Sequence, residues 1–371
     1  MMGLKVTNYS KENMAEIRID KTFVSQSNKP FIIAEMSGNH NQSLNRAKKI
    51  IKAAAESGVH AIKLQTYTAD TMTINHKGGL FNITDKSSLW YGRNLYELYK
   101  EAHTPWDWHK PLFDYAKELG LIYFSTPFDE TAVDFLETLD VPCYKIASFE
   151  NTDHPLLKKV AQTGKPVIMS TGIASISDIV ESVQILKENG CNQIALLKCT
   201  STYPSTPKNT NLATIPVLQQ IFPDCVIGLS DHTMGIGASI ASIALGARVI
   251  EKHFTLSRAD GGIDSAFSME PKEMKALVVE SERAFLALGR VQLTIQKAEE
   301  KSKVFKRSIY AVKDILEGEV FTKDNIRVIR PGDGLEPKYY EMLIGIKAIS
   351  DIKKGIPLNL NILYRHLTID K

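Results

Sequence analysis

Short apolar runs, each followed by a segment with helical periodicity, recur along most of the sequence. Eight runs begin at Pro30, Ala61, Leu121, Pro142, Pro166, Ile194, Cys225 and Val249. Such runs are typical of strands buried on both faces, and strands that alternate with helices form parallel sheets. Eight strand–helix units close a barrel, so the sequence predicts an α/β fold built on a (β/α)8 TIM barrel.

The segments between the runs carry helix start and stop signals. Ser43 is expected to cap a helix that stops at Gly58, and Ser177 with Asp178 is expected to start one that stops at Gly190. The second connection, residues 68–104, is an exception because it is rich in Gly, Asn, Asp and aromatic residues. A loop of that length is more often a lid or binding loop than filler.

A small second domain is expected after the barrel, because 371 residues exceed one typical domain and the composition changes after Gly289. The pattern A-x-x-D-I-x-x-G occurs at Ala311 and again at Ala348, and predicts two similar β-hairpin units. Residues 297–307 are interpreted as a charged linker or a short exposed helix. The predicted boundaries are 1–290 for the barrel with an N-terminal extension over 1–29, 291–306 for the linker, and 307–371 for the second domain.

Composition excludes several classes of function. The net charge is +3 and the Lys and Arg residues are spread along the chain, which gives little support to a nucleic-acid or membrane partner and leaves an anionic small molecule open. The four cysteines have no C-x-x-C spacing and are interpreted as reduced thiols. The N-terminus lacks the apolar stretch of a signal peptide, and the most apolar window, 235–247, is too short to span a bilayer. We therefore expect a soluble, cytoplasmic protein.

Polar residues interrupt several of the predicted strands. Successive side chains of a strand point to opposite faces, and the apolar face must meet the surrounding helices. This rule places a set of polar side chains inside the barrel near the carboxyl ends of the strands: Lys63, Gln65, Lys145, Ser230, His232, Glu251 and His253. Barrels of this type carry their chemistry at that end.

Two inward lysines need anionic partners, because an unpaired buried charge costs several kcal/mol. One interpretation is a pair of internal ion pairs, Lys63 with Glu35 and Lys145 with Glu251. The other is a bound anion, and the strand ends offer hydroxyl groups that suit phosphate: Ser125, Thr126, Ser148, Ser170, Thr171 and Ser230. Taken together, the lysines and hydroxyls favour a ligand with phosphate and carboxylate groups.

His232 and His253 end consecutive predicted strands, so their imidazoles can converge. Each one singly is more often a hydrogen-bonded core histidine than a ligand. As a converging pair beside carboxylates, they form a plausible divalent-metal site with open positions for substrate or water. His40, after the first strand, is a possible substrate contact.

The motifs resemble those of a known family, the phosphoenolpyruvate-dependent sialic acid synthases. The resemblance begins near Pro30, covers nearly the whole chain and runs in family order: A-E-M-S-G-N-H-N, I-K-L-Q-T-Y, F-S-T-P-F-D, Y-K-I-A-S-F-E-N, M-S-T-G, K-C-T-S-T-Y-P, G-L-S-D-H-T, I-E-K-H-F-T and R-P-G-D-G. The motif S-G-N-H-N-Q and the long loop are similar to the pseudaminate branch rather than to the N-acetylneuraminate and legionaminate enzymes. Ser201 stands where relatives carry Asn, so that contact does not transfer unchanged.

The resemblance implies a metal-dependent condensation of phosphoenolpyruvate with an open-chain diacetamido sugar, 2,4-diacetamido-2,4,6-trideoxy-L-altrose. It also implies a C-terminal antifreeze-like (SAF) domain and a domain-swapped homodimer, in which Arg330 acts across the dimer. His232 and His253 resemble the ligands of a divalent metal ion, usually Mn²⁺, with Mg²⁺ or Co²⁺ as alternatives. The residues that resemble phosphoenolpyruvate contacts are Lys63, Thr126, Lys145, Ser148, Ser170 and Ser230, and those that resemble sugar or water contacts are Glu35, Gln65, Tyr203 and Asp264.

We expect the catalytic residues to be Glu35, Lys63, Gln65 and Lys145. The acceptor lacks a 6-hydroxyl and carries an extra acetamido group, which suggests a less polar pocket supplied by Tyr67, Trp90, Tyr91 and Phe267. Two alternatives stay open: a sialate or legionaminate synthase, and a non-catalytic sugar- or anion-binding protein.

Overall fold

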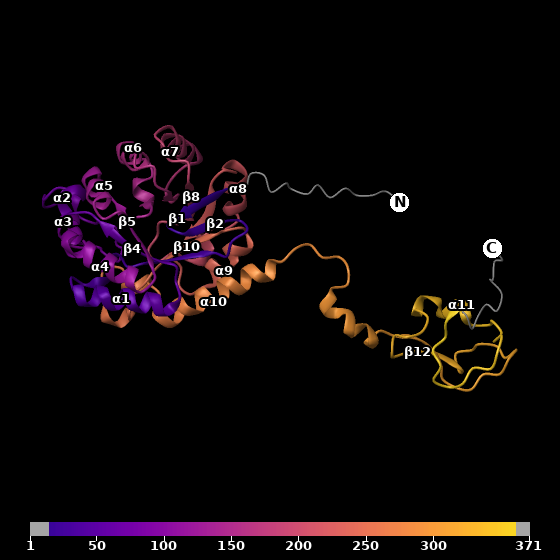
Figure 1. Ribbon diagram of the computed structural model, residues 1–371. Helices are drawn as coiled ribbons and strands as arrows, with labels where there is room; N and C mark the ends of the chain where they lie inside the picture. Colours follow the sequence, from indigo (N-terminus) through magenta and orange to yellow (C-terminus); the bar gives the residue numbers. More distant parts are fainter. Residues whose placement is uncertain (1–14, 361–371) are drawn as a thin grey trace. The chain divides into compact units, whose positions relative to one another are not determined.

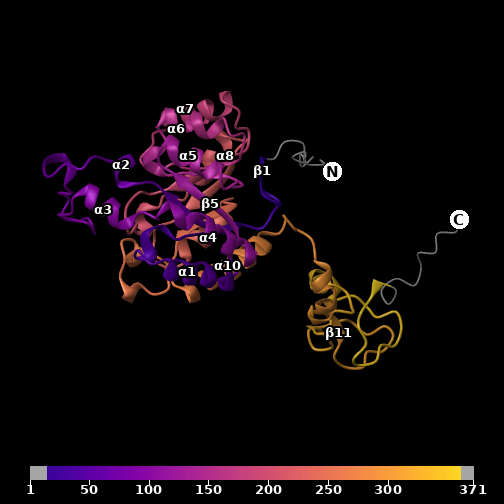
Figure 2. The ribbon, with the colours of Figure 1, turned by 60° about the vertical axis from the view of Figure 1, so that its left-hand side comes forward.

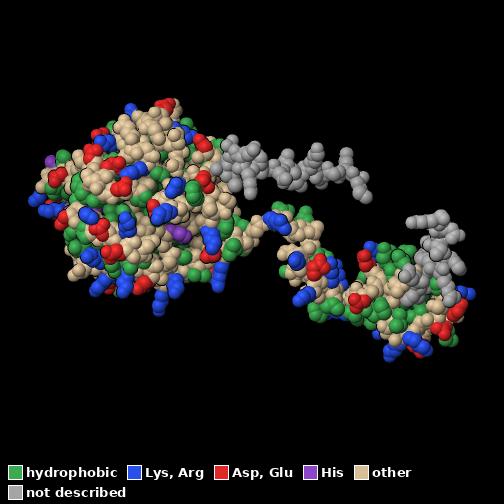
Figure 3. Space-filling model, in the orientation of Figure 1, with side chains coloured by type: hydrophobic (Ala, Val, Ile, Leu, Met, Phe, Trp, Pro, Cys, Tyr) green, Lys and Arg blue, Asp and Glu red, His purple; other side chains and the backbone are tan. Residues whose placement is uncertain are grey.

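The computed structural model describes residues 15–360, which divide after Gly289 into two compact units. Each unit is described by itself. The first 14 residues of the predicted N-terminal extension, and the end of the predicted C-terminal domain from residue 361, lie outside the described residues. On the visible face of the first unit, positive and negative side chains are interspersed (Figure 3).

Eight parallel strands close the barrel of the first unit, as predicted (Figure 1). In chain order they are β3 (Phe31–Glu35), β4 (Ala61–Thr66), β5 (Ile122–Pro127), β6 (Tyr144–Ile146), β7 (Val167–Ser170), β8 (Ile194–Cys199), β9 (Val226–Ser230) and β10 (Val249–His253). The last strand pairs with the first, and this pairing sets His253 beside Glu35. The register therefore aligns the carboxyl ends of strands that are far apart in sequence.

Helices surround the barrel strands. Helix α1 (Leu44–Ser57) begins at the predicted N-cap Ser43, whose hydroxyl accepts a hydrogen bond from Arg46 N, and it ends at Gly58 with a φ of 83°. The remaining outer helices are α4 (Trp106–Glu118), α5 (Glu130–Glu137), α6 (His154–Ala161), α7 (Ile176–Glu188), α8 (Thr214–Ile221), α9 (Gly237–Ala244) and α10 (Pro271–Leu288).

The predicted start of α7 at Ser177 and Asp178 was wrong. The helix begins earlier because Ser175 is the N-cap: its hydroxyl accepts from the Asp178 backbone N–H, and the Asp178 carboxylate accepts from the Ser175 backbone N–H. This reciprocal capping box satisfies two backbone donors that an N-cap at Ser177 would leave open.

The long connection over 68–104 contains regular structure. It forms α2 (Ala69–Met72), the 3₁₀ turn η2 (Gly79–Phe81) and α3 (Leu95–Ala102), and Figure 2 shows α2 and α3 close together at one side of the barrel. Thr68 and Asn94 cap the two α-helices through their side chains. We call residues 68–104 the insertion.

The N-terminal extension forms an antiparallel hairpin of β1 (Glu16–Ile19) and β2 (Thr22–Ser25). Ile17, Ile19 and Val24 are buried in the barrel core. The Arg18 N–H donates to Gln193 Oε1, directly before β8, so the hairpin covers the end of the barrel where the strands begin. The opposite end is left for the site.

The second unit begins with an exposed 3₁₀ segment, η7 (Lys297–Phe305), followed by β11 (Ser308–Ala311), β12 (Ile326–Ile329), η8 (Pro337–Tyr339) and α11 (Tyr340–Leu343). Two similar β-hairpin units were predicted for the two copies of A-x-x-D-I-x-x-G. The two copies instead pair with each other. Ile315 and Ile352, equivalent in the repeat, exchange reciprocal backbone hydrogen bonds of 2.8 Å. The pairing buries both side chains in one small core.

None of the helices within residues 15–360 has the length and apolar character that crossing a membrane requires.

Candidate active site

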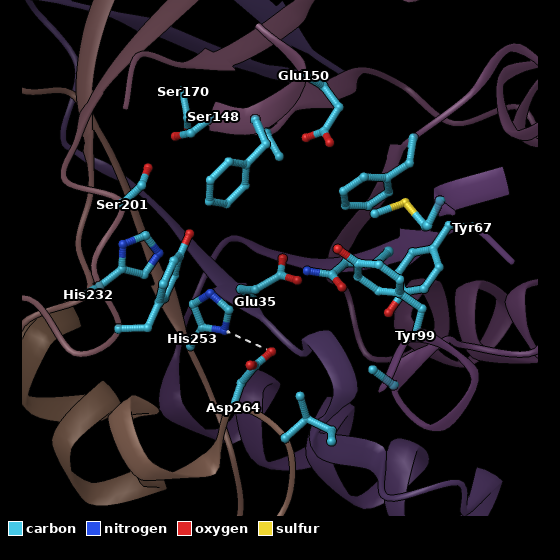
Figure 4. Close-up of a pocket in the computed structure, with 18 of the residues that line it drawn as sticks. Glu35, Tyr67, Tyr99, Ser148, Glu150, Ser170, Ser201, His232, His253 and Asp264 are labelled. Carbon is cyan, nitrogen blue, oxygen red and sulfur yellow. Dashed lines mark ion pairs between the residues drawn. The ribbon is translucent and has the colours of Figure 1, made fainter. Parts of the chain in front are cut away.

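A cavity of about 500 Å³ opens at the carboxyl end of the barrel strands, a volume typical of small-molecule sites. It brings together eleven of the thirteen predicted site residues: Glu35, Lys63, Gln65, Lys145, Ser148, Ser170, Tyr203, Ser230, His232, His253 and Asp264. Figure 4 labels six of them: Glu35, Ser148, Ser170, His232, His253 and Asp264. Thr126 is fully buried beneath them and accepts a hydrogen bond of 2.9 Å from Lys63 Nζ. Arg330 lies in the second unit and is exposed.

Two lysines and two carboxylates alternate at the base of the cavity. Lys63 forms an ion pair with Glu35, and its Nζ lies 3.8 Å from Glu251 Oε2. Lys145 Nζ lies 3.7 Å from Glu251 Oε1. The predicted internal ion pairs are thus present, with Glu251 shared between both lysines. All four side chains are buried, so these charges interact strongly and depend on one another.

The cluster nevertheless retains capacity for an anion. Burial raises the pKa of Glu35 to about 7, because desolvation of this carboxylate outweighs the attraction of Lys63. Near neutral pH, Glu35 is therefore partly protonated, and the cluster carries a net positive charge whenever the proton is bound. Glu35 Oε1 is buried and accepts no hydrogen bond from the described residues, so this oxygen can take up the proton.

Hydroxyl groups surround Lys145. Its Nζ donates to Ser170 Oγ at 2.7 Å, and Gly172 N donates to Ser148 Oγ at 3.2 Å. A Cβ at Gly172 would stand 2.2 Å from Ser201 Oγ and 2.6 Å from Ser148 Oγ, so only glycine allows these segments to approach. Lysine and hydroxyl groups at this spacing suit a phosphate.

Three of the hydroxyls predicted to serve a phosphate do not line the cavity: Thr126, described above, Ser125 and Thr171. Ser125 Oγ hydrogen-bonds to Thr66 Oγ1 at 2.6 Å, and Thr171 Oγ1 donates to Leu197 O at 3.1 Å. Both belong to the packing of the barrel wall, because side chains of neighbouring residues at the strand ends point to opposite faces.

The imidazoles of His232 and His253 converge at one side of the cavity, with ring centroids 5.3 Å apart. His232 Nδ1 lies 3.2 Å from Thr200 O, a contact that orients the ring. His253 Nδ1 is buried without a hydrogen bond, 3.9 Å from Asp264 Oδ2. Burial, reinforced by the charge of His232, lowers the pKa of His253 well below its ordinary value, so this ring is neutral, as a metal ligand must be.

These features fit a divalent metal ion held by two histidines. Within residues 15–360, no three His, Cys, Asp or Glu side chains are grouped so as to hold a metal ion by themselves. A metal at the histidine pair would therefore keep coordination positions for substrate and water.

Glu150 and Cys199 are among the cavity residues that sequence reasoning missed. Glu150 lies two residues beyond Ser148, and its Oε2 is buried without a hydrogen bond. Burial raises the pKa of Glu150 to about 7. Cys199, which was treated as one of the buried strand thiols, ends β8 with its Sγ 3.9 Å from His232 Nδ1. Both lie within motifs quoted above, and extending the strand-end rule two residues beyond Ser148 would have found Glu150.

Other predicted contacts have different surroundings. His40 is fully buried and does not line the cavity, because its Nε2 is hydrogen-bonded with Thr104 Oγ1 at 3.2 Å. Of the aromatic residues predicted to make the pocket less polar, Tyr67 and Trp90 line it, whereas Tyr91 is 53% exposed and does not. Phe267 packs behind the histidines, 4.8 Å from the His253 ring.

A TIM barrel with a buried lysine–carboxylate cluster and a histidine pair at the carboxyl ends of its strands is typical of enzymes that act on small molecules. The chain belongs to the NeuB family, whose model matches residues 50–293, and a SAF domain matches residues 306–361. It is 46% identical to the pseudaminic acid synthase of Campylobacter jejuni over 88% of this chain and 94% of that protein. It is 44% identical to the pseudaminic acid synthase of Helicobacter pylori, over 91% and 99%.

Among solved structures, the spore coat polysaccharide biosynthesis protein SpsE of Bacillus subtilis matches with a TM-score of 0.65 and 34% identity. The match covers 94% of this chain and 99% of that protein.

Proposed function

We propose that this protein is a pseudaminic acid synthase. It condenses phosphoenolpyruvate with 2,4-diacetamido-2,4,6-trideoxy-L-altrose and releases phosphate. The proposal rests on one observation: the buried cluster of Lys63 and Lys145 and the histidine pair line the same cavity. The similarity to two proteins named pseudaminic acid synthase supports the choice of acceptor.

Phosphoenolpyruvate binds at the lysine end of the cavity. Lys63 and Lys145 neutralise its carboxylate and phosphate groups, and Thr126, Ser148, Ser170 and Ser230 fix the lysines and donate hydrogen bonds. In the protein alone, Lys63 already donates to Thr126 and Lys145 to Ser170. Ser230 Oγ donates to Glu251 Oε1 at 2.9 Å. Because these side chains are already held in place, less conformational entropy is lost when the ligand binds.

The aldehyde of the open-chain sugar binds beside His232 and His253, which hold a divalent metal ion, for which we propose Mn²⁺, with Mg²⁺ or Co²⁺ as alternatives. When bound, the metal acts as a Lewis acid that polarises the carbonyl group. Gln65, Tyr203 and Asp264 position the sugar and the attacking water. Asp264 is itself held by a hydrogen bond from Ser37, and Tyr203 packs 4.5 Å from the His232 ring.

The reaction forms one carbon–carbon bond and releases phosphate. C3 of phosphoenolpyruvate attacks the aldehyde carbon, water adds to the cationic C2, and the resulting tetrahedral intermediate expels phosphate. Glu35 transfers protons at this centre, because a pKa of about 7 lets it both accept and donate a proton near neutral pH. Holding both substrates in one cavity removes much of the entropic barrier to bond formation.

We also propose the assembly that the family resemblance implies. The barrel spans 1–290, the linker 291–306 and the SAF domain 307–371, and the protein is a cytoplasmic domain-swapped homodimer. Arg330 of the SAF domain then contacts the acetamido group of the acceptor bound to the partner subunit.

Steady-state rates with three acceptors test the proposal, with product identified by mass spectrometry. A pseudaminic acid synthase turns over the diacetamido-L-altrose acceptor faster than the acceptors of legionaminate and N-acetylneuraminate synthases, and proteins with these two names are also similar to this chain. A preference for either of the other acceptors refutes the proposed substrate. The absence of phosphate release with all three, in the presence of phosphoenolpyruvate and Mn²⁺, would instead identify a non-catalytic binding protein.

A further inference from the structure

The two ends of the cavity differ in chemistry. Ser148, Ser170, Ser201 and the histidine pair lie at one end, whereas Tyr67 and Tyr99 lie at the other, with Glu35 between them (Figure 4). The polar end accounts for phosphoenolpyruvate and for the reacting aldehyde. The opposite end has no role in the chemistry proposed so far.

Three aromatic rings form the centre of this opposite end. Tyr67 meets Phe128 edge-on at 5.1 Å and Tyr99 edge-on at 5.9 Å. Tyr67 directly follows β4, Phe128 directly follows β5, and Tyr99 lies on α3 of the insertion. Edge-to-face contacts of this kind fix the positions of the rings. Because Tyr67 and Phe128 follow barrel strands, the three rings are held in place by the barrel.

Aliphatic side chains of the insertion complete the surface. Met72 ends α2, and Leu95 and Leu98 lie on the first two turns of α3. We call Tyr67, Met72, Leu95, Leu98, Tyr99 and Phe128 the apolar wall. Two polar residues of the insertion also reach the cavity, but their oxygens are engaged locally: Asp85 Oδ1 accepts from Ser87 N at 2.9 Å, and Ser88 Oγ accepts from Trp90 N at 3.2 Å.

We propose that the apolar wall is a specificity subsite for the non-reacting end of the acceptor, and that it selects a terminal methyl group over a hydroxymethyl group. The inference rests on the proposed function, which sets the aldehyde carbon at the histidine pair. The other end of the open-chain sugar then points away from the histidines, toward the wall. A methyl group there is buried against carbon, whereas a hydroxymethyl group gives up its hydrogen bonds to water.

The apolar character of the wall limits how strongly it can prefer a methyl group over a hydroxymethyl group. An apolar pocket rejects a ligand that merely adds a hydroxyl by only about 10²-fold. We therefore expect kcat/KM for the 6-deoxy acceptor to exceed that for its 6-hydroxy analogue, 2,4-diacetamido-2,4-dideoxy-L-altrose, by about 10- to 100-fold.

Met72→Gln tests the subsite, because it keeps the length of the side chain and adds an amide that can hydrogen-bond to the hydroxyl. Met72 is half-buried and ends a short helix, so the fold should tolerate the change. Met234→Gln is the matched control, since Met234 is 48% exposed and does not line the cavity. Leu95→Gln, also half-buried on the wall, is a second variant.

The measurement is kcat/KM of each full-length variant with both acceptors, together with the KM for phosphoenolpyruvate. We expect Met72→Gln and Leu95→Gln to reduce the preference for the 6-deoxy acceptor at least about fivefold, with an unchanged KM for phosphoenolpyruvate, and Met234→Gln to retain it. A wild-type protein that uses both acceptors equally well overturns the inference, as does an unchanged preference in the active wall variants. If the wild type uses neither diacetamido acceptor, the proposed function itself fails, which is a distinguishable result.

Discussion

Lys145 Nζ lies 3.7 Å from Glu251 Oε1, and both side chains are almost completely buried. Because Glu251 also lies 3.8 Å from Lys63, it is the carboxylate that both cavity lysines share. Changing any one member of this cluster therefore alters the charge balance of the others.

Lys145→Met should destabilise the protein by about 3 kcal/mol, because it leaves the buried Glu35 and Glu251 to share the single charge of Lys63. Adding Glu251→Gln should recover part of that loss, since it removes the excess negative charge. The free energy of unfolding in urea gives both values. If the double variant were less stable than Lys145→Met alone, the two side chains would not be coupled as described.

His232→Ala should abolish turnover and weaken Mn²⁺ binding while leaving the fold intact, because it removes a ligand at the mouth of the barrel rather than core volume. The control is His154→Ala, a partly exposed histidine on α6 that does not line the cavity. Calorimetric titration with Mn²⁺ and circular dichroism separate loss of metal from loss of fold. Metal-dependent activity in His232→Ala would contradict the assignment.

Gly172→Ala should raise the KM for phosphoenolpyruvate at least about tenfold, a cost of about 1.4 kcal/mol, because its Cβ would collide with Ser201 Oγ and Ser148 Oγ. Gly237→Ala is the matched control, since a Cβ there meets nothing within 4 Å. Steady-state kinetics with phosphoenolpyruvate as the varied substrate measures the effect. Equal KM values for the two variants would show that the close approach at Gly172 has no role in binding.

Glu150 should make stability fall as the pH rises. Burial raises its pKa from 4.5 to about 7 in the folded protein, so between these values the folded state binds more protons than the unfolded state. The loss begins above pH 4.5 and is complete above pH 7, where it amounts to at most about 3 kcal/mol. Glu150→Gln should therefore be more stable than the wild type at pH 8 and no more stable at pH 4. Thermal unfolding at both pH values tests the sign, and parallel pH profiles would count against it.

The barrel could be predicted from the sequence because its strands are continuous apolar runs, and strand parity then placed Lys63, Gln65 and Lys145 inside it. Parity applies only within a strand, which is why it could not separate Ser148 and Ser170, at the cavity, from Thr171, which follows the end of β7. Ser125 lies inside β5, where parity does apply. The apolar wall was only partly predicted, from Tyr67. Its other members come from α2, α3 and β5, and their convergence depends on tertiary packing that no local pattern records.

The pairing of Ile315 with Ile352 in the second unit extends in both directions. Gly318 N donates to Ala348 O, and Gly355 N donates to Ala311 O, so each A-x-x-D-I-x-x-G copy uses the backbone of the other. The Asp351 carboxylate accepts from Glu317 N, and the Asp314 carboxylate accepts from Lys354 N, in the same crossed manner. The two copies thus interlock about an approximate twofold axis, and a chain cut between them would lose the whole unit rather than half of it.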